Sequence, residues 1–251
     1  MLKALRARLN QKHRTIKYPA EPAVLPNLFR GYPHLDQSLC PSDCSICTSV
    51  CPTAAIQNCN GLSVDMGKCL FCPECEHVCP TAAVRFTNNE CLSTSEREDL
   101  VVRPGEQTRL AHTLGKDLLS MFGRSLKLRE ISAGGCNGCE ADTNVLSTPV
   151  FDLARFGIQF VASPRHADGI YVTGPITENM RIALLKTWEA IPAPKIVIAA
   201  GACAIDGGPF HGLPEIHGGV DKFLPVDLYV PGCPPHPVTI LDGLLRLLNR
   251  R

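Results

Sequence analysis

Fourteen cysteines in a chain of 251 residues are far more than a globular protein of this size ordinarily uses, and nine of them lie between residues 37 and 90. These nine include two runs of four in which the last cysteine is followed by proline. Thiolates at such spacing are typical ligands of cubane iron–sulfur clusters, because one tight loop presents three and the fourth reaches a neighbouring cluster. The runs are Cys40-x3-Cys44-x2-Cys47-x3-Cys51 and Cys69-x2-Cys72-x2-Cys75-x3-Cys79.

The crossing of the fourth cysteine predicts two sets of cluster ligands. The second run follows the pattern without deviation, whereas the first has one extra residue after Cys40. Cys59 is the nearby substitute for Cys40, although we expect it to be a free thiol. Cys91 lies outside both runs, and we expect it to be a plain cysteine. Group 1 is therefore Cys40, Cys44, Cys47 and Cys79, and group 2 is Cys51, Cys69, Cys72 and Cys75.

The remaining four cysteines follow predicted strands in the second half of the chain. Loops at the carboxyl ends of parallel strands converge, so three such loops can bring two, one and one cysteines to a third site. Glycines surround these cysteines and allow the backbone to approach a ligand closely. We expect a third [4Fe–4S] cluster here, while a structural zinc site remains the alternative that the spacing leaves open. Group 3 is Cys136, Cys139, Cys203 and Cys233.

The elements that must position group 3 are short β-branched runs that alternate with helical patterns. This alternation predicts a mostly parallel sheet with both faces covered, so the fold class is α/β in this part of the chain. The expected strands are 126–131, 159–162, 170–173, 195–199 and 226–230, and the expected helices are 141–146, 150–156, 178–190 and 238–249.

Four zones describe the chain as a whole. Within the second zone, the segments 44–56 and 72–84 match in spacing and both contain Cys-Pro-Thr-Ala-Ala, which indicates an internal duplication. A repeat of this size buries little apolar surface, so bound metal would have to stabilise it. The zones are a basic arm (1–36), a two-cluster domain (37–90), a linker with a connecting helix over 107–122 (91–125) and an α/β domain (126–251).

Charge and hydropathy limit the location and the partners. Residues 1–31 contain seven Lys or Arg and one Glu, although the whole chain has a net charge of only +1. Leu2, Leu5 and Leu9 recur at helical spacing in this basic arm, which fits a short helix lying on a membrane surface or a membrane subunit. The arm lacks the aromatic-rich pattern of RNA-binding segments, so we expect no nucleic acid partner. Neither a signal peptide nor an apolar stretch of 18 residues is found, which predicts a cytoplasmic protein with reduced thiols.

The second half of the chain resembles a known family. The residues that carry the resemblance are GGCNGCE (134–140), FGIQFVASPRHADGIYVTGPIT (156–177), GACAIDGG (201–208) and PVDLYVPGCPP (225–235). They are similar to the family shared by the terminal-cluster subunit of respiratory complex I and the small subunit of [NiFe]-hydrogenases. Its complex I members have adjacent cysteines at the first position, whereas Cys136-x-x-Cys139 is the hydrogenase arrangement. The resemblance is closest to membrane-bound, energy-converting group 4 hydrogenases, which include formate hydrogenlyase.

The first half is similar to the two-cluster ferredoxin-type subunit of complex I, in which TIKYP (15–19) and FRG (29–31) also precede the cysteine runs. The chain therefore resembles a fusion of two subunits. The implied fold is a small α+β domain of the bacterial 2[4Fe–4S] ferredoxin type, followed by a flavodoxin-like α/β domain with a parallel sheet.

The resemblance implies an iron–sulfur subunit of an oxidoreductase complex, which relays electrons through three [4Fe–4S] clusters to or from a large catalytic subunit that holds a Ni–Fe centre. Integral membrane subunits and a soluble electron donor or acceptor are the other implied partners, and the implied place is the inner face of the cell membrane. Glu140 is a candidate for proton transfer by the same resemblance, or a helix N-terminal charge favoured by the dipole. The alternatives are a quinone-reducing complex I-like subunit and a non-redox, zinc-stapled interaction module.

Overall fold

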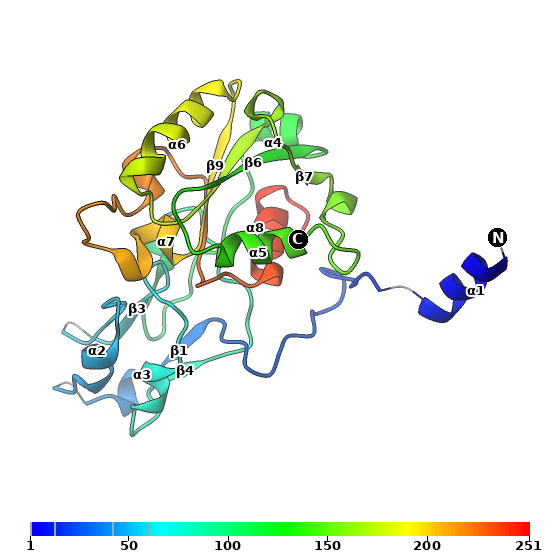
Figure 1. Ribbon diagram of the computed structural model, residues 1–251. Coiled ribbons are helices and arrows are strands. Elements are labelled where there is room, and N and C mark those ends of the chain that lie inside the picture. Colours follow the sequence, from blue (N-terminus) through cyan, green and yellow to red (C-terminus); the bar gives the residue numbers. More distant parts are fainter. Residues whose placement is uncertain (1, 13, 42, 60) are drawn as a thin grey trace.

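The computed structural model describes residues 2–12, 14–41, 43–59 and 61–251 (Figure 1). Its largest element is a five-stranded sheet in which every neighbouring pair of strands is parallel. This confirms the predicted parallel sheet in the second half of the chain. In spatial order, the strands are β10 (Leu228–Val230), β9 (Ile196–Ala200), β8 (Gly169–Thr173), β6 (Leu126–Ser132) and β7 (Ile158–Phe160).

Helices cover both faces of this sheet. Every residue of β8, β9 and β10 is buried, as expected for short apolar strands covered on two sides. One face packs against Phe122 of α4 and the apolar side of α8, and the other packs against Leu184 of α6 and Ile205 of α7. The helices of this half are α4 (Lys116–Phe122), α5 (Gly138–Val145), α6 (Glu178–Ala190), α7 (Ala202–Asp206) and α8 (Pro237–Leu247).

The cysteine-rich half consists of very short elements. Strand β5 comes from the following linker and pairs with β3, and the buried core of this half continues into the core between the sheet and α6 and α7. The two halves therefore share one hydrophobic core. The sheets are β1 (Pro33–Leu35) with β4 (Val84–Phe86), and β2 (Ile56–Gln57) with β3 (Ser63–Asp65) and β5 (Val101–Val102); the helices are α2 (Ile46–Val50) and α3 (Glu74–His77).

The basic arm begins with helix α1 (Leu2–Gln11), which projects away from the rest of the molecule (Figure 1). The chain then runs along the α/β half, where the N–H of Ile16 donates to the carbonyl of Val150 at 2.9 Å. Tyr18 is buried there, and its hydroxyl donates to Asp242 of α8 at 2.9 Å. In the part of the chain that the structure describes, no helix has the length and apolarity needed to cross a membrane.

Two predicted helices are wrong in extent. The expected helix over 107–122 is helical only in α4, because the N–H groups of Ala111 and Leu114 donate to the carbonyls of Ser93 and Leu247 instead of to a helical turn. The expected helix over 150–156 is a short 3-10 turn. The 3-10 turns are Gln37–Leu39, Glu98–Leu100, Leu153–Phe156, Pro164–His166, Gly208–Phe210 and Val220–Lys222.

Candidate iron–sulfur sites

Group 2 surrounds a small apolar cavity in the cysteine-rich half. All four of its cysteines line this cavity, together with Ile56, Val64 and Phe86. Burial, together with three nearby thiols, raises the pKa of Cys69 to about 12; these thiols belong to Cys75, Cys51 and Cys72. The structure therefore brings Cys51 of the first run to the cysteines of the second run.

Group 1 gathers around Cys47, which is buried in α2. Burial raises the pKa of the Cys47 thiol, and three neighbouring thiols add to this; they belong to Cys40, Cys44 and Cys79. Asn58 holds Cys40 in place, because its Nδ2 donates to Cys40 Sγ at 3.5 Å and to the carbonyl of Cys44 at 3.0 Å. Cys59 is exposed and lines a different surface depression, beside Arg103.

The two duplicated Cys-Pro-Thr-Ala-Ala segments fold alike. The N–H of Ala55 donates to Cys51 Sγ at 3.2 Å, and the N–H of Ala83 donates to Cys79 Sγ at 3.2 Å. The alanine before each donor has a positive φ, 51° at Ala54 and 55° at Ala82. A left-handed residue turns the following N–H toward the sulfur, and such hydrogen bonds stabilise thiolate ligands and tune a cluster's potential.

Hydrogen bonds outweigh burial at Cys79. Burial alone would raise its pKa, but hydrogen bonds from Thr81, Val84 and Ala83 lower the pKa of Cys79 overall. These hydrogen bonds therefore favour the thiolate form of Cys79.

Group 3 lies where three loops leave the carboxyl ends of β6, β9 and β10. Asn137, at φ 70°, begins helix α5 between Cys136 and Cys139, while Cys203 lies in α7 directly after β9. Burial raises the pKa of Cys139, and so do the thiols of the other three members; these are Cys203, Cys233 and Cys136. The three loops therefore converge at one edge of the parallel sheet.

Two glycines make room for the sulfur atoms of group 3. A Cβ at Gly201 would lie 2.6 Å from Cys139 Sγ, and a Cβ at Gly208 would lie 2.8 Å from Cys203 Sγ. Both glycines have positive φ, 89° and 55°. Glycine is therefore required at these positions both by the space around the thiols and by the backbone conformation.

The donor set fits [4Fe–4S] clusters in number and chemistry. Burial and neighbouring thiols raise the pKa of Cys75 and of Cys203 to about 12, so these thiols would need a nearby cation to ionise, which iron would supply. Within the described residues, no three His, Cys, Asp or Glu side chains come close enough together to hold a single metal ion. A cubane spreads its thiolates around a body of several atoms. Iron–sulfur ligation by the three groups stays a prediction.

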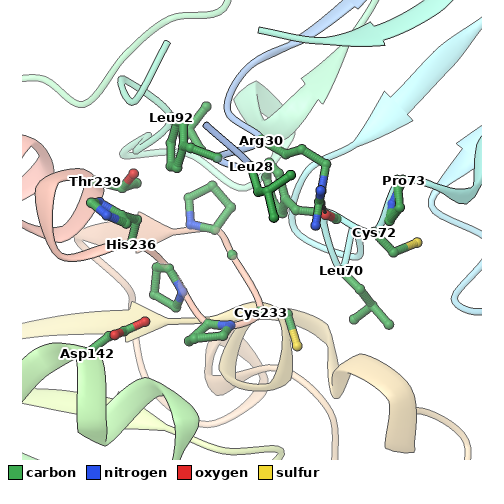
Figure 2. A pocket seen from close by; sticks show the side chains of 16 residues that line it. Leu28, Arg30, Leu70, Cys72, Pro73, Leu92, Asp142, Cys233, His236 and Thr239 are labelled. Atoms are coloured by element: carbon green, nitrogen blue, oxygen red, sulfur yellow. Dashed lines mark hydrogen bonds between the residues drawn. The ribbon is translucent and has the colours of Figure 1, made fainter. Parts of the chain in front are cut away.

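The three groups follow one another in space. Cys47 of group 1 raises the pKa of Cys75 of group 2, since α2 packs against α3. Cys72 of group 2 and Cys233 of group 3 line one cleft between the two halves (Figure 2). The order along the molecule is therefore group 1, group 2, group 3.

Glu140 lies in the first turn of α5 and is buried, with 8% of its surface exposed. Burial opposes ionisation, but hydrogen bonds from Ser132 and Thr173 lower the pKa of Glu140; the Thr173 hydroxyl donates at 2.7 Å. These hydrogen bonds favour the ionised form of the carboxylate beside group 3, and the part of Glu140 in proton transfer stays a prediction. Sequence reasoning missed Asn58, for which the only signal is an amide one residue before Cys59.

The match to known proteins begins inside the second half of the chain. Residues 136–247 match the family model described as NADH ubiquinone oxidoreductase, 20 Kd subunit. Formate hydrogenlyase subunit 7 of Escherichia coli is 47% identical over 132 residues, which cover 53% of this chain and 52% of that protein. The chain thus spans about half the length of this relative.

Two further relatives are covered over most of their length. A probable membrane-bound hydrogenase subunit, mbhJ, of Pyrococcus furiosus is 41% identical, with 58% of this chain and 86% of that protein covered. An NADH-quinone oxidoreductase subunit of Heliobacterium modesticaldum is 38% identical, with 64% of this chain and 88% of that protein covered.

Proposed function

Because this chain belongs to the NADH ubiquinone oxidoreductase 20 kDa subunit family, we propose that it is the electron-transfer subunit of a membrane-bound, complex I-like [NiFe]-hydrogenase. Its similarity to formate hydrogenlyase subunit 7 and to mbhJ supports the hydrogenase branch of the family. The spacing Cys136-x-x-Cys139 supports the same branch.

The serial order of the three cysteine groups is the observation that carries this proposal. When bound, each [4Fe–4S] cluster takes up and releases one electron at a time, so three in a row form a relay. The chain's thiols would provide the cluster ligands, and the N–H groups of Ala55 and Ala83 orient two of these thiols, those of Cys51 and Cys79. The apolar wall around group 2 keeps water away.

We further propose that the cysteine-rich half is a ferredoxin-type domain fused to the α/β half. The matching Cys-Pro-Thr-Ala-Ala turns and the crossing of Cys51 and Cys79 between the two runs support a duplicated two-cluster unit. The hydrophobic core that continues between the halves supports their action as one body.

The proposed partners follow from what is exposed at the two ends of the relay. Cys136 and Cys233 of group 3 are exposed, which suits a large catalytic subunit, holding the Ni–Fe centre, docked over them. Group 1, at the opposite end, suits a soluble electron donor or acceptor. Helix α1 exposes Leu2, Leu5 and Leu9 among basic residues, which suits attachment to membrane subunits at the cytoplasmic face of the cell membrane.

A quinone-reducing role is the second candidate, and it is favoured by the match to the NADH-quinone oxidoreductase subunit of Heliobacterium modesticaldum over 88% of that protein. Hydrogen-dependent reduction of a redox dye by the purified complex separates the two functions. A hydrogenase reduces the dye under hydrogen, and replacement of Cys233 by serine abolishes this activity. Quinone reduction from a reduced donor, with no hydrogen-dependent activity in an intact complex, would instead support the second candidate.

A further inference from the structure

Arg97 connects the two cluster-bearing halves through two carboxylates. Its guanidinium donates to both oxygens of Asp65, at 2.9 Å from Nη1 and 2.8 Å from Nη2. The same Nη2 lies 3.7 Å from Oδ1 of Asp206. These three side chains are each about one-fifth exposed, so the ion pairs are largely shielded from water. A bidentate pair of this kind fixes the relative orientation of the guanidinium and the carboxylate as well as the distance between them.

Asp65 is part of the loop that presents group 2. It ends β3, its carbonyl accepts the N–H of Cys69 at 3.0 Å, and its Oδ1 accepts the N–H of Gly67 at 2.9 Å. The carboxylate that Arg97 holds is therefore part of the turn that delivers Cys69, the most buried thiol of group 2.

Asp206 belongs to the α/β half, which contains group 3. It ends α7, the helix that carries Cys203. The loop of group 2 packs directly on this helix, because a Cβ at Gly67 would lie 2.8 Å from Cγ2 of Ile205 and 2.9 Å from Cζ of Arg97.

The linker itself is anchored to the sheet close to Arg97. Thr94 and Tyr229 of β10 exchange two backbone hydrogen bonds, of 3.1 and 2.8 Å. Arg97 follows Thr94 by three residues, so the backbone that carries Arg97 is anchored to β10.

From this arrangement, we propose that Arg97 is a positioning residue that fixes the separation and orientation of the group 2 and group 3 clusters. It acts by joining the Cys69 turn to the Cys203 helix through Asp65 and Asp206. The inference rests on the proposed function, since it presupposes clusters in groups 2 and 3.

Three variants separate positioning from folding. Arg97→Met removes the charge and both hydrogen bonds to Asp65, and leaves the Asp65 carboxylate without its ion-pair partner. Asp206→Asn is milder, because it keeps the Arg97–Asp65 pair and weakens only the contacts of Asp206 itself, those with Arg97 at 3.7 Å and with Nδ1 of His211 at 3.2 Å. Arg97→Lys keeps the positive charge but cannot form the bidentate hydrogen bonds to Asp65. Arg103→Gln is the matched control, since this linker arginine is half exposed and pairs only with Glu106, at 3.5 Å, among the described residues.

The readout is the magnetic coupling between the reduced clusters, measured by pulsed EPR on the purified protein, with iron content measured alongside. We expect Arg97→Met and Asp206→Asn to retain iron. The magnetic coupling between the group 2 and group 3 clusters should be weaker on average and more widely distributed than in the wild type. We expect Arg97→Lys to lie between them and the wild type, and Arg103→Gln to match the wild type.

Hydrogen–deuterium exchange provides a second readout that does not depend on the clusters. We expect the amides of 65–69 and 202–206 to exchange faster in Asp206→Asn than in Arg103→Gln. Unchanged coupling and unchanged exchange in Asp206→Asn would overturn the inference while leaving the relay intact. Absence of iron from the wild-type protein would instead overturn the proposed function, and this inference with it.

Discussion

Cys72 and Cys233 line the same cleft, although one belongs to the cysteine-rich half and the other follows the last strand of the parallel sheet (Figure 2). Cys72 also raises the pKa of Cys233, so the two thiols lie within electrostatic range of each other. The junction between the halves is therefore where the proposed relay passes from one domain to the other.

Replacement of Cys233 by serine tests group 3. We expect the variant to lose about a third of its iron and the EPR signal of one cluster, because one of three four-thiolate sites is broken. Cys91→Ser is the control, since Cys91 is half-buried and lies outside the three groups. Its Sγ accepts a hydrogen bond from Nη2 of Arg251 at 3.4 Å. Equal iron content in both variants would contradict the assignment of Cys233.

Replacement of Gly201 by alanine tests the space around Cys139. The new Cβ would lie 2.6 Å from Cys139 Sγ in a backbone at φ 89°, so we expect the group 3 signal to be lost while the signals of groups 1 and 2 persist. Gly115→Ala is the matched control, because its Cβ would meet nothing within 4 Å. An intact group 3 signal in Gly201→Ala would mean that the loops do not approach as described.

Glu130 predicts a pH dependence of stability. Burial in the sheet and the nearby Glu140 raise the pKa of Glu130 from 4.5 to about 7, and its Oε1 has no hydrogen-bond partner among the described residues. The folded state holds a proton that the unfolded chain has released, so this contribution to stability is complete below pH 4.5 and is lost as pH rises through 7.

Glu130→Gln should therefore flatten the fall in stability between pH 5 and 8, with a gain of about 1–2 kcal/mol at pH 8 after allowance for the partial exposure of the side chain. Thermal unfolding midpoints across this range measure the effect. Glu189→Gln, at an exposed position on α6, is the control. Parallel pH profiles for Glu130→Gln and the wild type would argue against a half-buried, protonated Glu130.

Tyr18 fastens the basic arm to α8. Its hydroxyl donates to the fully buried Asp242, which is also paired with Arg246 at 2.7 Å and Arg251 at 2.6 Å. Tyr18→Phe removes a hydrogen bond to a charged acceptor, and we expect a loss of about 1.5–3 kcal/mol in urea unfolding. We also expect faster proteolysis of the arm.

The control for Tyr18 is Tyr32→Phe, which removes a hydrogen bond between two neutral hydroxyls, those of Tyr32 and Thr108, at 2.8 Å. Its expected cost is smaller, about 0.5–1.5 kcal/mol. Equal effects of the two variants would show that the Asp242 carboxylate gives the Tyr18 bond no special strength.

The sequence predicts the parallel sheet and the candidate ligands because local patterns encode both. Apolar runs such as 196–200 are recognisable as buried strands, and the Cys-x2-Cys spacing itself identifies the cysteines as candidate metal ligands. The Asp65–Arg97–Asp206 bridge could not be predicted, because its members are far apart in the chain and have no shared periodicity. The helix expected over 107–122 was too long because Ala111 and Leu114 bond to distant carbonyls, which no local pattern reveals.

We propose that twelve thiols in three groups hold iron–sulfur clusters in series. The most direct test is iron, acid-labile sulfide and zinc analysis of the anaerobically purified protein, combined with EPR after dithionite reduction. We expect about twelve iron and about twelve sulfide atoms per chain, with three interacting [4Fe–4S] signals. A colourless, EPR-silent protein that contains zinc, or no metal, would contradict the claim.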